Sequence, residues 1–119
     1  MVLNGLLPGW GYWLIISMLP SLACVLQSEV GLSCPAIDIN AACAGFIYAL
    51  DYADSILKAG KARRVMIVCS EVMSRLLDWT DRSTCVLFGD GAGAVVLDGG
   101  ENLFHSRLTS EGDINIINH

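Results

Sequence analysis

The sequence has few charged residues and no pattern typical of a metal or nucleic-acid site. Only 16% of its 119 residues are Asp, Glu, Lys or Arg, against about 25% in an average domain. Its 7 basic residues are scattered, which argues against a nucleic-acid partner. It has no Cys-x-x-C pair and only two histidines, so no zinc site is expected. The composition favours a folded, apolar chain and excludes a disordered one.

The N-terminal segment, residues 1–28, contains no charge at all. A secretory signal needs a basic start, and Ser21–Cys24, although similar to a lipoprotein cleavage box, has none before it. Pro8 and Pro20 interrupt the apolar run, whereas a membrane-spanning helix needs about 20 apolar residues in a row. We therefore predict a buried core or a subunit contact here, with a membrane-anchored protein as the weaker alternative.

What the chain has instead is an excess of apolar residues. They make up 54% of the sequence, and the mean hydropathy is +0.55. One domain at most is expected at this length, and a small domain needs polar side chains to cover its large exposed surface. The composition therefore predicts that another part of a larger assembly covers some of this chain. The net charge of −5 identifies no class of partner.

Five cysteines are present, an odd number that does not suggest a disulfide framework. They are Cys24, Cys34, Cys43, Cys69 and Cys85. For four of the five, we expect reduced thiols that are buried as small hydrophobic side chains in a cytoplasmic protein.

The apolar pattern predicts an α/β chain. Helices are expected from Pro20 to about Gly31 and from Ala41 to Ala59, with Gly60 ending the second and an Asp54–Lys58 ion pair on its surface. Short strands are expected at residues 13–17, 35–40, 64–70, 94–97 and 103–109. The strands at 64–70 and 94–97 are continuously apolar, which is typical of strands covered on both faces.

The most informative stretch is Asp38–Phe46, which places Cys43 between a predicted strand and a helix start. Unpaired N–H groups and the helix dipole stabilise negative charge there, and the thiolate is the nucleophilic form of cysteine. Small neighbours leave room for a substrate. A catalytic nucleophile is one interpretation. The other interpretation is a buried cysteine packed tightly beside small residues, and the spacing of the residues alone favours this second interpretation.

A second stretch, Phe88–Ala94, contains a Gly-x-Gly-x-Gly pattern. Such a pattern can cradle a phosphate, but here it does not follow a strand and open a helix as a dinucleotide site would. Packing and turn formation are the default explanation.

Together these stretches resemble the β-ketoacyl-acyl carrier protein synthase III family, condensing enzymes with the thiolase-like fold. The resemblance extends over roughly residues 19–98, with the blocks in the family's order. The blocks are Leu19–Gln27, Cys34–Asp38, Ala41–Phe46, Tyr48–Leu50, Thr80–Arg82 and Leu87–Ala94. The resemblance implies a partial thiolase-like N-terminal domain over 19–119, preceded by a divergent segment at 1–18.

The resemblance also implies roles for particular residues. Cys43 matches the nucleophile that takes an acyl group from coenzyme A, and its backbone N–H supplies half of an oxyanion hole. Arg82 matches the arginine that contacts the nucleotide end of coenzyme A; a solvated loop arginine is its ordinary interpretation. Phe88 and Met73 match positions that line the substrate tunnel and acyl pocket, although an ordinary core role is equally expected. No cofactor is implied, because acyl-coenzyme A is a substrate.

Other parts of the family pattern have no counterpart in this sequence. The family's catalytic histidine and asparagine belong to its second half, and neither His105 nor His119 has their sequence context. The implied sheet order is 3-2-1-4-5, with residues 35–40 as strand three and strands one and two missing. Trp13–Ser17 is the one candidate for a substitute strand.

Two functional hypotheses follow. The first is a part of a synthase III that retains the nucleophile and part of the coenzyme A site, and whose partners are acyl-coenzyme A and malonyl-acyl carrier protein. The second is a non-enzymatic interaction module. The family dimerises through its third strand, so a homodimer through Pro35–Asn40 is expected in either case.

Overall fold

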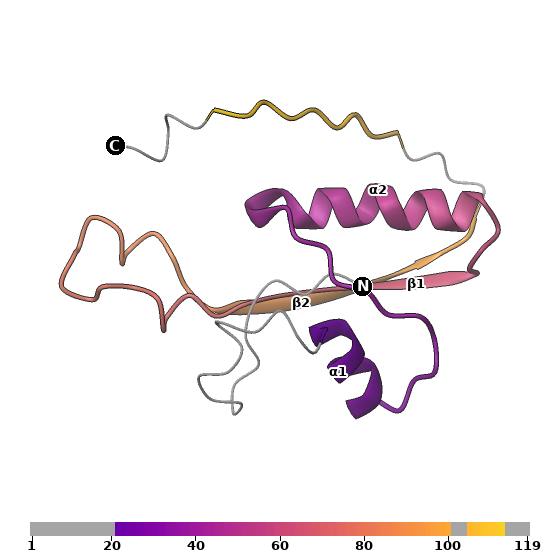
Figure 1. Cartoon of the computed structure of the whole chain (residues 1–119), viewed down its shortest axis with the longest axis horizontal. Coiled ribbons are helices and arrows are strands. Elements are labelled where there is room, and N and C mark those ends of the chain that lie inside the picture. The colour runs from indigo at the N-terminus through magenta and orange to yellow at the C-terminus, as the bar shows by residue number, and fades with distance from the viewer. Residues whose placement is uncertain (1–20, 101–104, 114–119) are drawn as a thin grey trace.

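The computed structural model describes residues 21–100 and 105–113. In these residues, two helices lie on opposite faces of a two-stranded sheet (Figure 1). The elements in chain order are α1 (Leu22–Glu29), the 3-10 turn η1 (Ala42–Ala44), α2 (Gly45–Lys58), β1 (Arg64–Glu71) and β2 (Gly91–Asp98). The predicted α/β class is confirmed. The expectations for residues 1–18, including the strand at 13–17, lie outside the described residues.

The sheet is one antiparallel pair in continuous register from Arg64 opposite Asp98 to Glu71 opposite Gly91. β1 matches the strand predicted at 64–70. β2 begins three residues earlier than predicted, so the second half of the glycine-rich stretch is strand rather than loop. Its glycines take part in the ladder because backbone groups, not side chains, make the hydrogen bonds between strands.

Helix α2 packs on β1 through small residues. Ala49 and Ala53 are almost fully buried against Ile67, the largest fully buried side chain of the described core. Val65 and Cys69 border the same cluster, as expected for alternate residues on one face of a strand. The small alanine side chains allow the helix to lie close to the sheet, which fixes the position of its N-terminus above the end of β1.

Helix α1 packs against the opposite face. Leu22 and Ala23 are buried, with Val68 beside them. The N–H groups of Leu22 and Ala23 donate to the two carboxylate oxygens of Asp38, at 2.9 and 2.8 Å. The Ser21 hydroxyl accepts from the N–H of Cys24. This double cap anchors the segment that leads to Cys43, because Asp38 lies only five residues before it.

Both helices end at a glycine in the left-handed region. Gly31 and Gly60 have φ of +68°. The N–H of Gly60 donates to the Leu57 carbonyl and the N–H of Lys61 donates to the Ile56 carbonyl, the two bonds of a Schellman motif. The predicted stops at Gly31 and Gly60 are confirmed, as is the Asp54–Lys58 ion pair, at 2.6 Å.

Two of the predicted strands are wrong. Residues 35–40 are not a strand, because no neighbouring strand pairs with their backbone in the described part of the chain. Residues 105–113 also have no strand partner and instead run along the outer side of α2 (Figure 1). The Ser110 hydroxyl lies 2.9 Å from the Tyr48 hydroxyl, and Ser106 donates to Asp51.

The predicted burial of the apolar residues is only partly correct. β2 is a strand as expected, and its Leu97 packs against the cluster of Ala49, Ala53 and Ile67, but Val95 and Val96 are 40% and 59% exposed. The cysteines also differ from expectation. All five are free, and three of them (Cys24, Cys34 and Cys43) are exposed.

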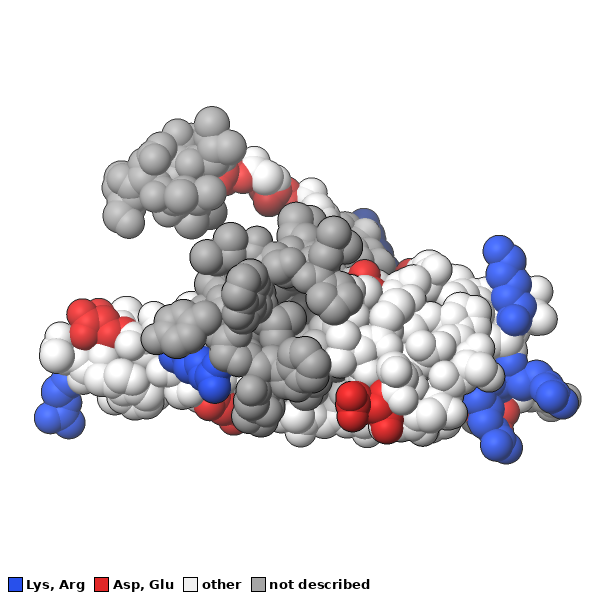
Figure 2. Space-filling view, turned by 60° about the horizontal axis from the view of Figure 1, so that its bottom comes forward, with Lys and Arg blue, Asp and Glu red and all other residues white. Residues whose placement is uncertain are grey.

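Charge is sparse on the face shown in Figure 2, where basic residues gather toward the two ends of a largely uncharged surface. Four of the 7 basic residues fall within residues 58–64, where α2 turns into β1.

Of the described helices, none is long and apolar enough to cross a membrane.

Candidate active site

Cys43 lies in the 3-10 turn that leads into α2. Immediately before it, Ala42 has φ of +46°, a left-handed conformation that is rare for a residue with a Cβ. The N–H of Ala42 donates to Oδ1 of Asn40 at 3.0 Å, and the N–H of Ala44 donates to the carbonyl of Ala41 at 3.0 Å. This strained, hydrogen-bonded turn presents the exposed Cys43 at the start of the helix.

The N-terminus of α2 is open to a ligand. No side chain caps it, and its first turn carries no acidic residue. The helix is 14 residues long, so the partial positive charge at this end is substantial. A negatively charged or polarised group bound beside Cys43 would be stabilised by that charge.

A cleft of about 360 Å³ opens in front of Cys43. One wall is the turn and first helical residues, a second is the end of β1, and the third is the glycine-rich stretch. The lining residues are Ala42, Cys43, Phe46, Cys69, Ser70, Glu71, Gly89, Asp90, Gly91, Ala92 and Gly93. The two stretches singled out in the sequence thus meet at one site.

Asp90 connects the glycine-rich wall to the loop between β1 and β2. Its carboxylate accepts from the Ser74 hydroxyl at 2.6 Å and from the Ser74 N–H at 2.7 Å. These bonds, with smaller contributions from the Met73 backbone and the Arg75 charge, hold the pKa of Asp90 below its ordinary value. The ionised carboxylate therefore fixes one side of the cleft to the loop.

Two further aspartates shape the loop around Arg82. The Asp81 carboxylate accepts from the hydroxyls of Ser83 and Thr84, at 2.6 and 2.7 Å, and these bonds lower its pKa. The Asp78 pKa is lowered by bonds from Thr80, whose hydroxyl lies at 2.7 Å. Arg82 is exposed on the loop that these short-range bonds hold.

The other residues predicted for the site are not among those that line the cleft. Phe88 is 48% exposed and precedes Gly89, a lining residue. Met73 is half-buried and precedes Ser74, which binds Asp90. Arg82 lies on the loop, which extends away from α2 in Figure 1. The structure thus places Cys43 in the cleft and leaves Arg82, Phe88 and Met73 outside its lining.

The sequence interpretation missed Cys69 as a cleft residue, having taken it for a buried strand cysteine. A signal was available in the alternation of β1, since Val65, Ile67 and Cys69 share one face. That face carries the helix that follows Cys43. To place Cys69 at the cleft, one must also know that β2 begins at Gly91. The predicted strand at 94–97 leaves out Gly93, which is the cross-strand partner of Cys69.

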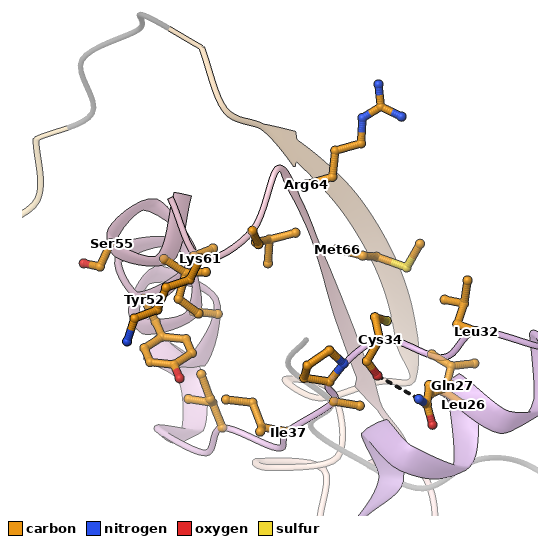
Figure 3. Close-up of a pocket in the computed structure, with 18 of the residues that line it drawn as sticks. Leu26, Gln27, Leu32, Cys34, Ile37, Tyr52, Ser55, Lys61, Arg64 and Met66 are labelled. Carbon is orange, nitrogen blue, oxygen red and sulfur yellow. Dashed lines mark hydrogen bonds between the residues drawn. The ribbon is translucent and has the colours of Figure 1, made fainter. Parts of the chain in front are cut away.

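A larger apolar groove of about 800 Å³ lies apart from this cleft (Figure 3). It is bounded by α2, residues 32–39 and the start of β1, and Tyr52, Ile37 and Met66 line it. Gln27 donates to the carbonyl of Cys34 at its rim, at 2.7 Å. Cys43 is not among its lining residues. The groove lies between residues 35–40, which the resemblance assigns to strand three, and β1.

Comparisons with known proteins agree on one family. Residues 37–112 match the sequence profile of 3-oxoacyl-[acyl-carrier-protein] synthase III. The chain is 52% identical over 96 residues to beta-ketoacyl-[acyl-carrier-protein] synthase III of Vesicomyosocius okutanii, covering 79% of this chain and 31% of that one. The enzyme of the same name from Xanthomonas campestris is 55% identical over 96 residues, covering 78% and 30%.

A solved structure leads to the same family. The crystal structure of 3-oxoacyl-[acyl-carrier-protein] synthase III from Aquifex aeolicus matches with a TM-score of 0.68 and 54% identity, over 72% of this chain and 28% of that one. The described residues form part of a thiolase-like α/β fold, with a cysteine in a cleft at a helix start. The chain belongs to the 3-oxoacyl-[acyl-carrier-protein] synthase III family, and it spans about a third of the length of its relatives.

Proposed function

We propose that this chain supplies the nucleophile of a synthase III-type acyltransferase of fatty acid biosynthesis. Such an enzyme condenses an acyl group from acyl-coenzyme A with malonyl-acyl carrier protein. The observation that supports this most strongly is the position of Cys43, which is exposed in a cleft at an uncapped helix N-terminus. It also lies within the residues that match the family.

In the proposed reaction, the Cys43 sulfur attacks the thioester carbonyl of acyl-coenzyme A. A bond forms between sulfur and the carbonyl carbon, and negative charge develops on the carbonyl oxygen. The backbone N–H of Cys43 donates to that oxygen, and the positive end of α2 stabilises the charge. The bond to the coenzyme A sulfur then breaks, and the leaving thiolate takes up the proton lost by Cys43. The acyl group remains on Cys43 as a thioester.

The surrounding residues receive supporting roles in this proposal. Arg82, exposed on the loop, contacts the phosphorylated nucleotide end of coenzyme A, since a guanidinium suits phosphate oxygens. Phe88 and Met73 line the path of the acyl chain. Phe88 precedes Gly89, which lines the cleft, and Met73 precedes Ser74, which binds the cleft residue Asp90, and both positions support this role. The reaction needs no cofactor. A cytoplasmic location is also inferred, in keeping with five free thiols.

The first test is acylation of the chain itself. Incubation with acetyl-coenzyme A is expected to add one acetyl group to the intact mass, and hydroxylamine should remove it as expected of a thioester. Cys43→Ser should abolish the adduct. Cys85→Ser is the matched control, because Cys85 is free but is not among the residues that line the cleft. An adduct that survives in Cys43→Ser, or none in the wild type, contradicts the proposal.

Condensation is expected to stop after this half-reaction. The catalytic histidine and asparagine of the family have no match in the sequence, so malonyl-acyl carrier protein should not discharge the acyl group from Cys43. Formation of a β-ketoacyl product by the chain alone would show that the missing groups are not required.

We further infer a homodimer through residues 35–40. Their backbone has no strand partner among the described residues, and Ile37 is 40% exposed, so an equivalent strand could pair there. Sedimentation equilibrium should report a dimer that Ile37→Pro weakens at least tenfold, because proline removes a donor. Ile37→Val is the control. Equal dimerisation of both variants would place the interface elsewhere.

A further inference from the structure

Two cysteines, from segments far apart in the sequence, line the same cleft. Cys43 lies in the turn before α2, and Cys69 lies near the end of β1. The Cys43 side chain is exposed and that of Cys69 is half-buried. Neither is oxidised in the structure. The cleft therefore holds two free thiols in addition to the acidic side chains of Glu71 and Asp90.

The orientation of Cys69 is fixed by the strand. It borders the cluster of Ala49, Ala53 and Ile67, so its side chain lies on the α2 face of the sheet. Because α2 runs antiparallel to β1 (Figure 1), its N-terminus lies over the C-terminal end of the strand, where Cys69 is found. The turn that carries Cys43 is thus above the face to which Cys69 points.

The space between these thiols is open. Directly opposite Cys69 in the sheet is Gly93, and cross-strand partners project to the same face. A Cβ added at Gly93 would meet no atom within 4 Å. The cross-strand neighbour of Cys69 therefore places no side chain in the cleft, and the thiol is accessible from the Cys43 side.

We propose that Cys69 is a resolving thiol for Cys43, so that oxidation closes a Cys43–Cys69 disulfide across the cleft. The oxidant is a hydroperoxide, with hydrogen peroxide as the simplest member. The disulfide would occupy the sulfur that the proposed acyl transfer needs, and a dithiol would restore it. The site is thereby a reversible thiol switch built from the two walls of the cleft.

The chemistry balances in two steps. The Cys43 thiolate attacks one peroxide oxygen; the O–O bond breaks and hydroxide leaves, giving a sulfenic acid on Cys43 and, after protonation, one water. The Cys69 thiolate then attacks the sulfenic sulfur; the S–O bond breaks, an S–S bond forms and a second hydroxide leaves as water. Two thiols are oxidised by two electrons, and one peroxide is reduced to two waters.

The test is a non-reducing tryptic map of the intact chain after mild treatment with hydrogen peroxide. Trypsin places the two sulfurs in different peptides. Cys69 is the one cysteine of peptide 65–75, and Cys43 lies in peptide 1–58, because no Lys or Arg precedes Lys58. The expected product joins peptide 1–58 to peptide 65–75 and disappears on treatment with dithiothreitol. The intact mass should fall by two hydrogen atoms.

Variants assign the linked sulfur within peptide 1–58. Cys43→Ser should abolish the cross-link, whereas Cys24→Ser and Cys34→Ser should leave it. Cys85→Ser is the matched control, since Cys85 is also half-buried and should not affect the link. In Cys69→Ser, the sulfenic acid should persist on Cys43 and be captured by dimedone. When the chain is oxidised in urea, which unfolds it, cross-links should form without preference for the Cys43–Cys69 pair.

Two results would overturn the proposal. One is a cross-link that persists in Cys43→Ser, and the other is oxidation of Cys43 in the wild type to sulfinic acid with no link to Cys69. Circular dichroism of each variant shows whether the fold is retained. The blocking of acylation rests on the proposed function, but the disulfide does not. A cross-link in a chain that acetyl-coenzyme A never acylates would support the switch and contradict the acyl transfer.

Discussion

The hydrogen bonds of Asp90 hold one wall of the cleft to the loop that follows β1. Asp90 lines the cleft with Cys43 and accepts two hydrogen bonds from Ser74, on the loop that follows β1. Because the bonds favour the ionised carboxylate, its pKa lies below the ordinary value of 3.8. An aspartate with a lowered folded-state pKa adds stability that is fully present above the unfolded pKa. That stability is lost as the pH falls through the folded pKa.

The first prediction follows from the lowered pKa of Asp90. The Ser74 amide proton should change its chemical shift with a midpoint below pH 3.8, because the Asp90 carboxylate that it binds has a lowered pKa. Asp90→Asn, which cannot ionise, should abolish this titration. An NMR titration from pH 7 down to the lowest pH at which the chain stays folded measures this midpoint. A midpoint above 3.8 would contradict the hydrogen bonds assigned to Asp90.

Single residues also set the limits of sequence-based prediction at the site. Cys43 was identified because its small neighbours, a predicted helix start and a glycine-rich stretch form a family pattern. The strain at Ala42 was not predictable, since alanine has no preference for positive φ. It arises because the turn must connect Asn40, which binds the Ala42 N–H, to a helix whose axis the sheet has already fixed.

At the scale of the elements, the helix ends were the most predictable features. Gly31 and Gly60 follow apolar faces and are the residues that tolerate left-handed backbone. The strand at 64–70 was equally clear, because an uninterrupted apolar run of this length favours a strand. The predicted strands at 35–40 and over the described residues 105–109 are incorrect, although their local sequences suit a strand. A strand, however, requires a neighbouring strand, and local sequence does not show whether one is present.

A second prediction concerns the end of α2. Gly60→Ala should lower the free energy of unfolding by about 1 kcal/mol, because the native φ of +68° strains any residue with a Cβ. Steric clash does not contribute, since no atom lies within 4 Å of the added Cβ. Gly100→Ala, also unobstructed but without a positive φ, is the control and should change stability little. Urea unfolding measures both, and equal effects would contradict the explanation.

For the molecule as a whole, the high apolar content predicted from composition has a visible consequence. The core of the described residues is small, while large apolar side chains such as Val86 (68% exposed) and Leu87 (72%) lie on the surface. Such exposure is typical of a chain whose surface packs against other parts of a larger protein. The relatives, of which this chain spans about a third, are consistent with that interpretation.

The third prediction tests this exposure. Leu87→Ser should raise the ammonium sulfate concentration at which the chain precipitates, because it removes exposed apolar surface, and should leave the melting temperature nearly unchanged. Leu22→Ser is the contrasting variant, since Leu22 is only 7% exposed in the core beneath α1. That variant should unfold at a lower temperature. A loss of thermal stability in Leu87→Ser would show that this loop is packed rather than exposed.

The connections between the elements imply an order of folding. α2 and β1 are joined by residues 59–63, whereas β1 and β2 are joined by residues 72–90. Closing the longer loop costs entropy that grows with its length, and the glycines of β2 give little side-chain packing in return. We therefore expect α2 to dock on β1 early and β2 to pair late. The cleft around Cys43 would then be completed only in the last folding step, so a partly folded chain would expose the thiol without its binding site.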